Sequence, residues 1–87
     1  MYRIELTREA ESSYRWLYKR DRALFERVDA CLEELKKNPY LGKPLKGALK
    51  GDYSYRIGVY RIIYAVVQKR LVIYILDIAH RREVYRR

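Results

Sequence analysis

Three strand-like runs in the second half of the chain limit the possible folds more than any other part of the sequence. They are YSYRI (53–57), YRIIYAVV (60–67) and LVIYILDIA (71–79), all rich in β-branched and aromatic residues. Only two or three residues separate neighbouring runs. Such gaps allow a tight turn but not the long crossover that a parallel pair needs. The sequence therefore predicts an antiparallel meander.

The first half predicts one short strand and two amphipathic helices. Residues 2–6 alternate in polarity, and Thr7 and Asp21 are good N-caps for the helices that follow. Pro39 ends the second helix, because the residue before a proline resists helical geometry. Apolar residues recur at helical spacing after each cap. The expected core positions are Ala10, Tyr14 and Leu17 in the first helix and Leu24, Val28, Cys31, Leu32 and Leu35 in the second.

The order of these elements predicts an α+β fold, with two helices packed on one face of a small antiparallel sheet. The segment YLGKPLKGALKGD (40–52) contains three glycines and a proline and predicts a loop. Hydrophobic residues make up 49% of the 87 residues, enough for one modest core. We expect residues 1–87 to form one domain.

Charge is distributed unevenly along the chain. Residues 1–42 hold nine Lys/Arg and eight Asp/Glu, a net charge of +1, whereas residues 43–87 hold eleven and three, a net charge of +8. A basic half joined to a balanced half is typical of proteins that bind nucleic acid or an acidic partner. The alternative is a generally basic protein kept soluble by its charge.

The number of cysteines and the length of the apolar runs indicate the cellular compartment. Cys31 is the only cysteine, so the chain forms no internal disulfide, which suits a reducing cytosol. The longest apolar runs have six residues, far short of the ~20 that span a bilayer. We therefore expect a cytoplasmic protein with no membrane association.

The chain has one histidine and no metal-ligand spacing, so we expect no cofactor and no metal site.

The first hairpin predicts an unusual pair of cations. Gly58-Val59 fits a type II′ turn, which places Arg56 opposite Arg61. Like charges directly opposite each other are unfavourable by up to ~1 kcal/mol, so an anion is expected between them.

A three-residue turn at 68–70 would then pair Val67 with Leu71, place Asp77 opposite Arg61, and continue the same face to Arg81. The alternative role of Arg61 is an ion pair with Asp77, and one arginine can do both.

The segment HRREVYRR (80–87) has two interpretations. It is either a solvated, frayed tail or half of a phosphate site whose other half is Arg56 and Arg61. Guanidinium, ammonium and phenol groups suit RNA cleavage in which the substrate's own 2′-hydroxyl attacks, because arginine grips phosphate oxygens at two points. Acid–base work would fall to Tyr85, Lys50 or His80, and Tyr85 is equally suited to stack on a base.

The second half resembles the RelE/ParE toxin superfamily. The resemblance rests on the patterns G-x-Y-R-x-x-Y and H-R-x-x-x-Y, together with the helices, the Asn-Pro that ends the second one and the loop after it. The matching residues are Gly58, Tyr60, Arg61, Tyr64, His80, Arg81 and Tyr85. The resemblance covers nearly the whole chain and implies a RelE-like domain.

What the resemblance implies is the toxin of a type II toxin–antitoxin system. It would be an mRNA interferase, a ribosome-dependent, metal-independent endoribonuclease that inhibits translation. Its partners would be the ribosome, mRNA and a small acidic, RelB-like antitoxin. The alternatives are a ParE-like toxin acting on DNA gyrase and a non-catalytic RNA- or partner-binding module.

The resemblance also implies roles for single residues. The catalytic set would be Arg56, Arg61, Arg81 and Tyr85, and the RNA-binding set would be Lys46, Lys50, Ser54, His80, Arg82 and Arg86. One departure is that RelE-like enzymes often carry two cations, two residues apart, on the strand before Y-R. Here these positions are Ser54 and Arg56, so we expect a weaker enzyme unless Lys50 supplies the missing charge.

Overall fold

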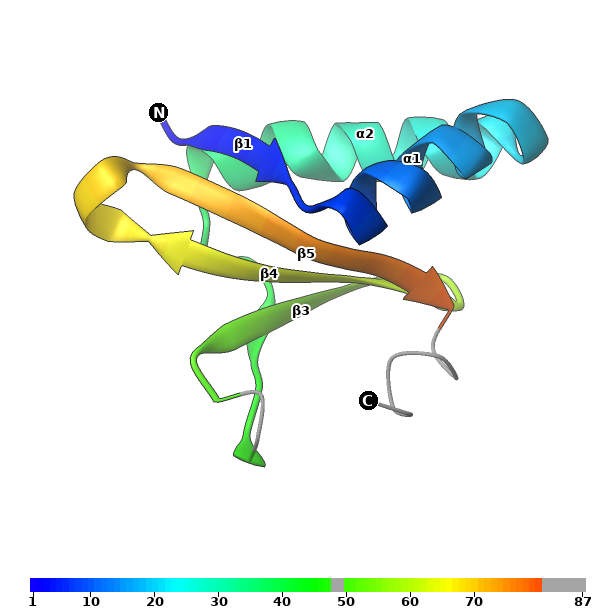
Figure 1. Cartoon of the computed structure of the whole chain (residues 1–87). Coiled ribbons are helices and arrows are strands. Elements are labelled where there is room, and N and C mark those ends of the chain that lie inside the picture. Colours follow the sequence, from blue (N-terminus) through cyan, green and yellow to red (C-terminus); the bar gives the residue numbers. More distant parts are fainter. Residues whose placement is uncertain (48–49, 81–87) are drawn as a thin grey trace.

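The structure, a computed structural model, describes residues 1–47 and 50–80. The helices α1 and α2 follow the first strand, and the remaining strands form the second half of the chain (Figure 1). In chain order the elements are β1 (Arg3–Leu6), α1 (Arg8–Arg20), α2 (Arg22–Lys37), β2 (Lys43–Pro44), β3 (Asp52–Ile57), β4 (Tyr60–Val67), the 3-10 turn η2 (Gln68–Arg70) and β5 (Val72–His80).

Both predicted helix caps are confirmed. The Thr7 hydroxyl accepts a hydrogen bond from the Ala10 amide at 3.2 Å and donates to the Leu76 carbonyl at 2.8 Å, which ties the start of α1 to β5. The Asp21 carboxylate accepts from the Leu24 amide at 3.1 Å. Helix α2 ends at Lys37, just before Asn38 and Pro39.

The strands form one five-stranded sheet in the order β1-β5-β4-β3-β2. The α+β fold class is confirmed, but the sheet is mixed rather than wholly antiparallel, because β1 lies parallel to β5. The predicted loop 40–52 also contains the short edge strand β2, in which Lys43 pairs with Ser54 and Pro44 with Tyr53. A two-residue strand containing a proline carries no periodicity that a sequence pattern can reveal.

The sheet has one face covered by helices and one that no helix covers, which we call the open face. Both helices lie on the same side of β3, β4 and β5 (Figure 1). The covered face and the helices share the core, whose buried members are Ala10, Leu17, Val28, Cys31, Leu32, Leu35, Ile57, Ile62, Tyr64, Ile73, Ile75 and Ile78. On the open face a small apolar cluster forms from Ile63 and Ala79, with Leu45 and Leu76 packed against them. The prediction that the helices cover one face is confirmed.

The first hairpin has the predicted register. Arg56 pairs with Arg61, and Ile57 pairs with Tyr60. Gly58 has a φ of +60°, while Val59 does not have a positive φ, as a type II′ turn requires. The two arginines therefore lie directly opposite each other on the open face.

The predicted register of the second hairpin is wrong. Val67 pairs with Val72 rather than Leu71, because the turn also takes in Leu71, which adopts a left-handed conformation with φ 54°. A further register shift lies between Ile63 and Tyr64. Asp77 is consequently opposite Ile63, and Ala79 is opposite Arg61. The longer turn and the irregularity each shift the register by one residue, a total of two residues. Because side chains alternate between the two faces, Asp77 still lies on the same face as Arg61.

Candidate nucleic-acid interface

Strand register arranges the open face in rows that run across the sheet. One row contains Arg56, Arg61 and Ala79, and the next contains Lys43, Ser54, Ile63 and Asp77. Directly opposite side chains lie on the same face, with Cβ atoms ~4.5–5.5 Å apart. The first two rows therefore gather cations from β2, β3 and β4. We call Lys43, Ser54, Arg56 and Arg61 the cationic end of the open face.

Ser54 holds the Arg61 guanidinium in place. The Nη1 group of Arg61 donates a hydrogen bond to the Ser54 hydroxyl at 3.2 Å. Ser54 is 4% exposed, and Arg61 itself is partly buried. The serine that sequence reasoning offered as an RNA-binding group thus contacts an arginine and is shielded from solvent. Its hydroxyl reduces the freedom of the Arg61 side chain.

Arg56 lies beside Arg61 but is exposed. Its Nε donates a hydrogen bond to the Gly58 carbonyl at 3.1 Å, which turns the side chain toward the hairpin tip. The two arginines therefore differ: Arg61 is held from the sheet interior, whereas Arg56 is held from the turn.

A groove of about 270 Å³ opens at the cationic end. Three cations line it, namely Lys43, Arg56 and Arg61, and no carboxylate of the described residues does so. The remaining lining residues are Leu41, Gly42, Ser54 and Tyr55. Lys43 was missed by sequence reasoning, because only the pairing of β2 with β3 brings it opposite Ser54.

A buried tyrosine anchors the segment that carries this lysine. Tyr64 is fully buried, and its hydroxyl donates to the Pro39 carbonyl at 2.8 Å and accepts from the Gly42 amide at 2.9 Å. Burial raises the pKa of Tyr64 to about 12. A Cβ atom on Gly42 would lie 2.7 Å from the Tyr64 hydroxyl and 2.9 Å from the Ser54 carbonyl oxygen, so only glycine fits there.

Two carboxylates share the open face with these cations. Asp77 is 3% exposed and lies diagonally from Arg61, within reach of a long side chain. Asp52 lies two residues before Ser54, and burial raises the pKa of its carboxyl. Neither carboxylate lines the groove, so the groove itself presents positive charge.

The other predicted site residues are distributed around the molecule. Lys46 and Lys50 are exposed, and neither lines the groove. His80 pairs with Tyr60, so its ring lies on the covered side of the sheet, 5.8 Å from the Tyr60 ring centre. The remaining predicted residues lie outside the described part of the chain; they are Arg81, Arg82, Tyr85 and Arg86.

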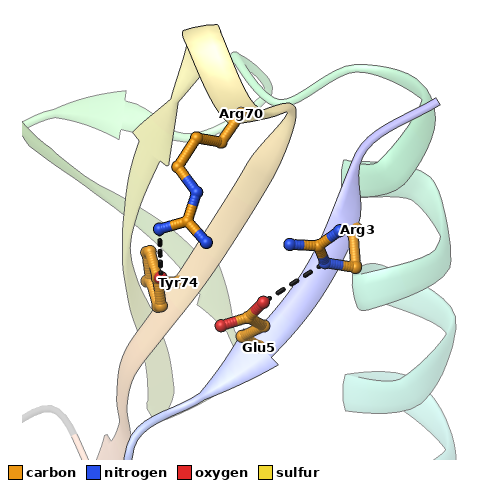
Figure 2. Close-up of polar contacts among 4 residues, drawn as sticks. All are labelled: Arg3, Glu5, Arg70 and Tyr74. Carbon is orange, nitrogen blue, oxygen red and sulfur yellow. Dashed lines mark hydrogen bonds and ion pairs between the residues drawn. The ribbon is translucent and has the colours of Figure 1, made fainter.

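At the opposite end of the open face, each arginine contacts an oxygen of a neighbouring side chain. The Nε of Arg3 contacts the Glu5 carboxylate at 3.2 Å, and Nη1 of Arg70 donates to the Tyr74 hydroxyl at 3.4 Å (Figure 2). Register places Glu5 directly beside Tyr74. We call these residues the paired end of the open face.

Residues 1–47 and 50–80 give little support to chemistry that uses a metal ion or a reactive thiol. No group of three or more His, Cys, Asp or Glu side chains there is arranged to hold a metal ion. Cys31 is buried in the core as predicted, and burial raises the pKa of its thiol to about 12. Within the same residues, no helix is both long and apolar enough to cross a bilayer.

Comparison with known proteins identifies relatives over most of the chain. A family model described as the ParE toxin of a type II toxin–antitoxin system matches residues 4–85. Toxin RelG of Mycobacterium tuberculosis is 36% identical over 61 residues, which cover 69% of this chain and 70% of that protein. Toxin RelE of the same organism is 42% identical over 62 residues, covering 66% of this chain and 64% of its own length.

Solved structures show the same fold. The RelBE2 toxin–antitoxin complex of Mycobacterium tuberculosis contains a chain with 31% identity and a TM-score of 0.77, covering 92% of this chain and 98% of its own. A YoeB/ParE toxin from Agrobacterium tumefaciens has a TM-score of 0.83 at 21% identity, with coverage of 92% and 98%. The second likeness supports the fold alone.

Proposed function

Because the chain belongs to the ParE toxin family of type II toxin–antitoxin systems, we propose that this toxin is an endoribonuclease that cleaves mRNA on the ribosome. The observation that carries the proposal is the Arg56–Arg61 pair, held opposite each other beside a groove lined by cations. The two relatives of the chain from Mycobacterium tuberculosis are named Toxin RelG and Toxin RelE, which agrees with a toxin of the RelE type.

The proposed reaction uses a nucleophile that the substrate supplies. The 2′-hydroxyl oxygen of one nucleotide attacks the adjacent phosphorus, and the bond from phosphorus to the 5′-oxygen breaks. The products are a 2′,3′-cyclic phosphate and a free 5′-hydroxyl, so one proton leaves the 2′-oxygen and one reaches the 5′-oxygen. Negative charge builds on the non-bridging oxygens in the transition state, where positioned arginines stabilise it most.

The residues have distinct proposed roles. Arg61 binds a non-bridging oxygen from a fixed position, because Ser54 orients its guanidinium. Arg56 neutralises charge from the hairpin side. Arg81 and Tyr85 complete the set by their resemblance to the family motif, with Tyr85 either transferring a proton or stacking on a base. None of these steps uses a metal ion.

The proposed partner is a small acidic antitoxin. Several related structures are described as complexes of toxins with RelB or YefM antitoxins. A segment that folds onto the cationic end would pair its carboxylates with Arg56 and Lys43, and association should slow as salt rises.

Primer extension on translated mRNA after induction of the toxin tests the proposal. Discrete breaks that require translation support it, and the same breaks should appear on programmed ribosomes in a purified reaction. A parallel supercoiling assay with DNA gyrase covers the alternative within this superfamily. Intact mRNA combined with inhibited gyrase would refute the ribonuclease proposal, and intact mRNA with unaffected gyrase would leave a non-catalytic binding module.

A further inference from the structure

The strand β3 lacks a cation at position 54, but the neighbouring strand supplies one. Lys43 on β2 pairs directly with Ser54. Because opposite residues of an antiparallel pair project to the same face, Lys43 lies beside the serine and next to the Arg61 guanidinium that the serine holds. The charge missing from β3 is therefore present one strand away, at a separation of ~4.8 Å between strands.

The backbone of Lys43 is held more firmly than its place in a glycine-rich segment suggests. Its neighbour Gly42 donates its amide to the buried Tyr64 hydroxyl, and the same hydroxyl donates to Pro39. The close approach of Gly42 to Tyr64 and to the Ser54 carbonyl leaves no room for a side chain. On the other side, the Leu45 amide donates to the Asp52 carbonyl at 2.9 Å.

The Lys43 side chain is exposed and lines the groove, and within the described residues it forms no ion pair. Other exposed lysines of the described residues, such as Lys46 and Lys69, also form no ion pair. Lys43 differs from them because it lines a groove together with two arginines. Lys43 faces two arginines across a groove that no carboxylate of the described residues lines, so an anion bound there would reduce the repulsion among the three cations.

We propose that Lys43 is a phosphate-binding residue of this site, and that the groove holds a phosphodiester of single-stranded RNA between Lys43 on β2 and Arg61 on β4. The inference rests on the proposed function, since it names a further group for the same substrate. In this proposal Lys43 supplies the positive charge that is absent at position 54, where the chain has a serine. Tyr64 acts as a positioning residue, because it holds Gly42 and thereby the lysine.

A binding experiment separates this inference from the cleavage chemistry. The probe is a fluorescein-labelled 2′-O-methyl RNA oligonucleotide, which has no free 2′-hydroxyl and is not cleaved. Fluorescence anisotropy over a series of salt concentrations gives the Kd and the slope of log K against log salt. Each phosphate contact in a single strand contributes about 0.7 to that slope. Lys43→Ala should weaken binding roughly tenfold at low salt and reduce the slope by about 0.7, whereas Lys43→Arg should retain both.

The matched control is Lys69→Ala, which removes the same charge from the exposed η2 turn at the other end of the sheet. It should change neither quantity. Equal losses in Lys43→Ala and Lys69→Ala, or wild-type binding by Lys43→Ala, would overturn the inference. If Lys43→Ala binds normally while Arg61→Ala does not, the RNA site at Arg61 stands and Lys43 is outside it. If the wild-type protein itself does not bind the probe, the inference fails even where cleavage on ribosomes is observed.

Discussion

Both ends of the open face carry arginines, but the groups that these arginines contact differ. At the paired end, Arg3 contacts Glu5 and Arg70 contacts a tyrosine hydroxyl. At the cationic end, Arg61 is held by a serine hydroxyl and faces Arg56. Cations that lie directly opposite each other raise the free energy of the folded state, and an anion bound between them lowers it. Under the proposed function, the cationic end is the RNA-binding surface and the paired end is an ordinary solvated one.

The largest effect is expected from removal of Arg61, the arginine that Ser54 orients. Arg61→Ala should lower single-turnover cleavage on programmed ribosomes by roughly two to three orders of magnitude, because one preorganised donor to a developing oxyanion is worth ~2.7–4 kcal/mol. The expected loss should appear without a change in thermal stability beyond a few degrees. Cleavage at the wild-type rate by a folded Arg61→Ala protein would remove this residue from the site.

The second prediction concerns the anchor beneath the cationic end. Tyr64→Phe removes the hydroxyl that bonds both Pro39 and Gly42 and leaves two backbone groups without a partner. The free energy of unfolding should fall by ~1–3 kcal/mol, a decrease in Tm of several degrees for a domain of this size. Thermal and urea unfolding measure this. Tyr74→Phe at the exposed paired end is the matched control and should cost much less.

The same tyrosine makes stability depend on alkaline pH. Burial raises the pKa of Tyr64 from an ordinary value of 10 to about 12, so the folded protein favours the neutral phenol. This contribution is fully present below pH 10 and is lost as pH rises toward 12. The Tyr64→Phe protein should therefore lose less stability than the wild type over that interval. Parallel pH profiles for the two proteins would contradict the assignment, since Tyr14 and Cys31, whose pKa values are also raised to about 12, remain in both.

Sequence patterns were sufficient for the hairpin that creates the cationic end, because glycine at the first turn position fixes its register. They failed at the second hairpin for a physical reason. Leu71 adopts a left-handed conformation that a leucine rarely takes, and a bulge near Ile63 leaves no signature in hydropathy. The two shifts together leave Asp77 on the predicted face of the sheet. The predicted pairing partner is wrong, because Asp77 lies opposite Ile63 rather than Arg61.

The candidate site was predicted only in part. Arg56 and Arg61 were found because they lie on adjacent, strongly patterned strands. Lys43 was not found, because its position depends on a two-residue strand and on the buried Tyr64 hydroxyl that holds its neighbour. Ser54 was assigned to the correct face, but its contact with Arg61 depends on side-chain rotamers that no sequence pattern specifies.

Ser54→Ala leaves both arginines of the cationic end present and removes only the hydrogen bond that restrains Arg61. Arg61 would lose its hydrogen bond at 3.2 Å and sample more rotamers. Cleavage should fall by at least roughly tenfold, in line with ~1.5–3 kcal/mol for a hydrogen bond to a charged group. Single-turnover kinetics should show the loss in the rate constant at saturating ribosomes rather than in KM. Ser54→Thr retains a hydroxyl and serves as the control, and an equal loss in both variants would indicate a packing defect instead.

The smallest effect is expected at the paired end. Arg3 and Glu5 are 61% and 39% exposed, so water and salt screen their attraction. Exposed ion pairs contribute at most ~1 kcal/mol and often nothing measurable, so Arg3→Ala should change the free energy of unfolding by less than ~0.5 kcal/mol. A double-mutant cycle with Glu5→Ala in urea isolates the pair, and 0.5 M salt should abolish its coupling, given a Debye length of only ~4 Å. Cleavage by Arg3→Ala should equal that of the wild type, because this charge lies across β5 and β4 from the groove. A loss of cleavage comparable to that of Ser54→Ala would mean that the whole open face attracts RNA through its summed charge, and the distinction between its two ends would then have no functional meaning.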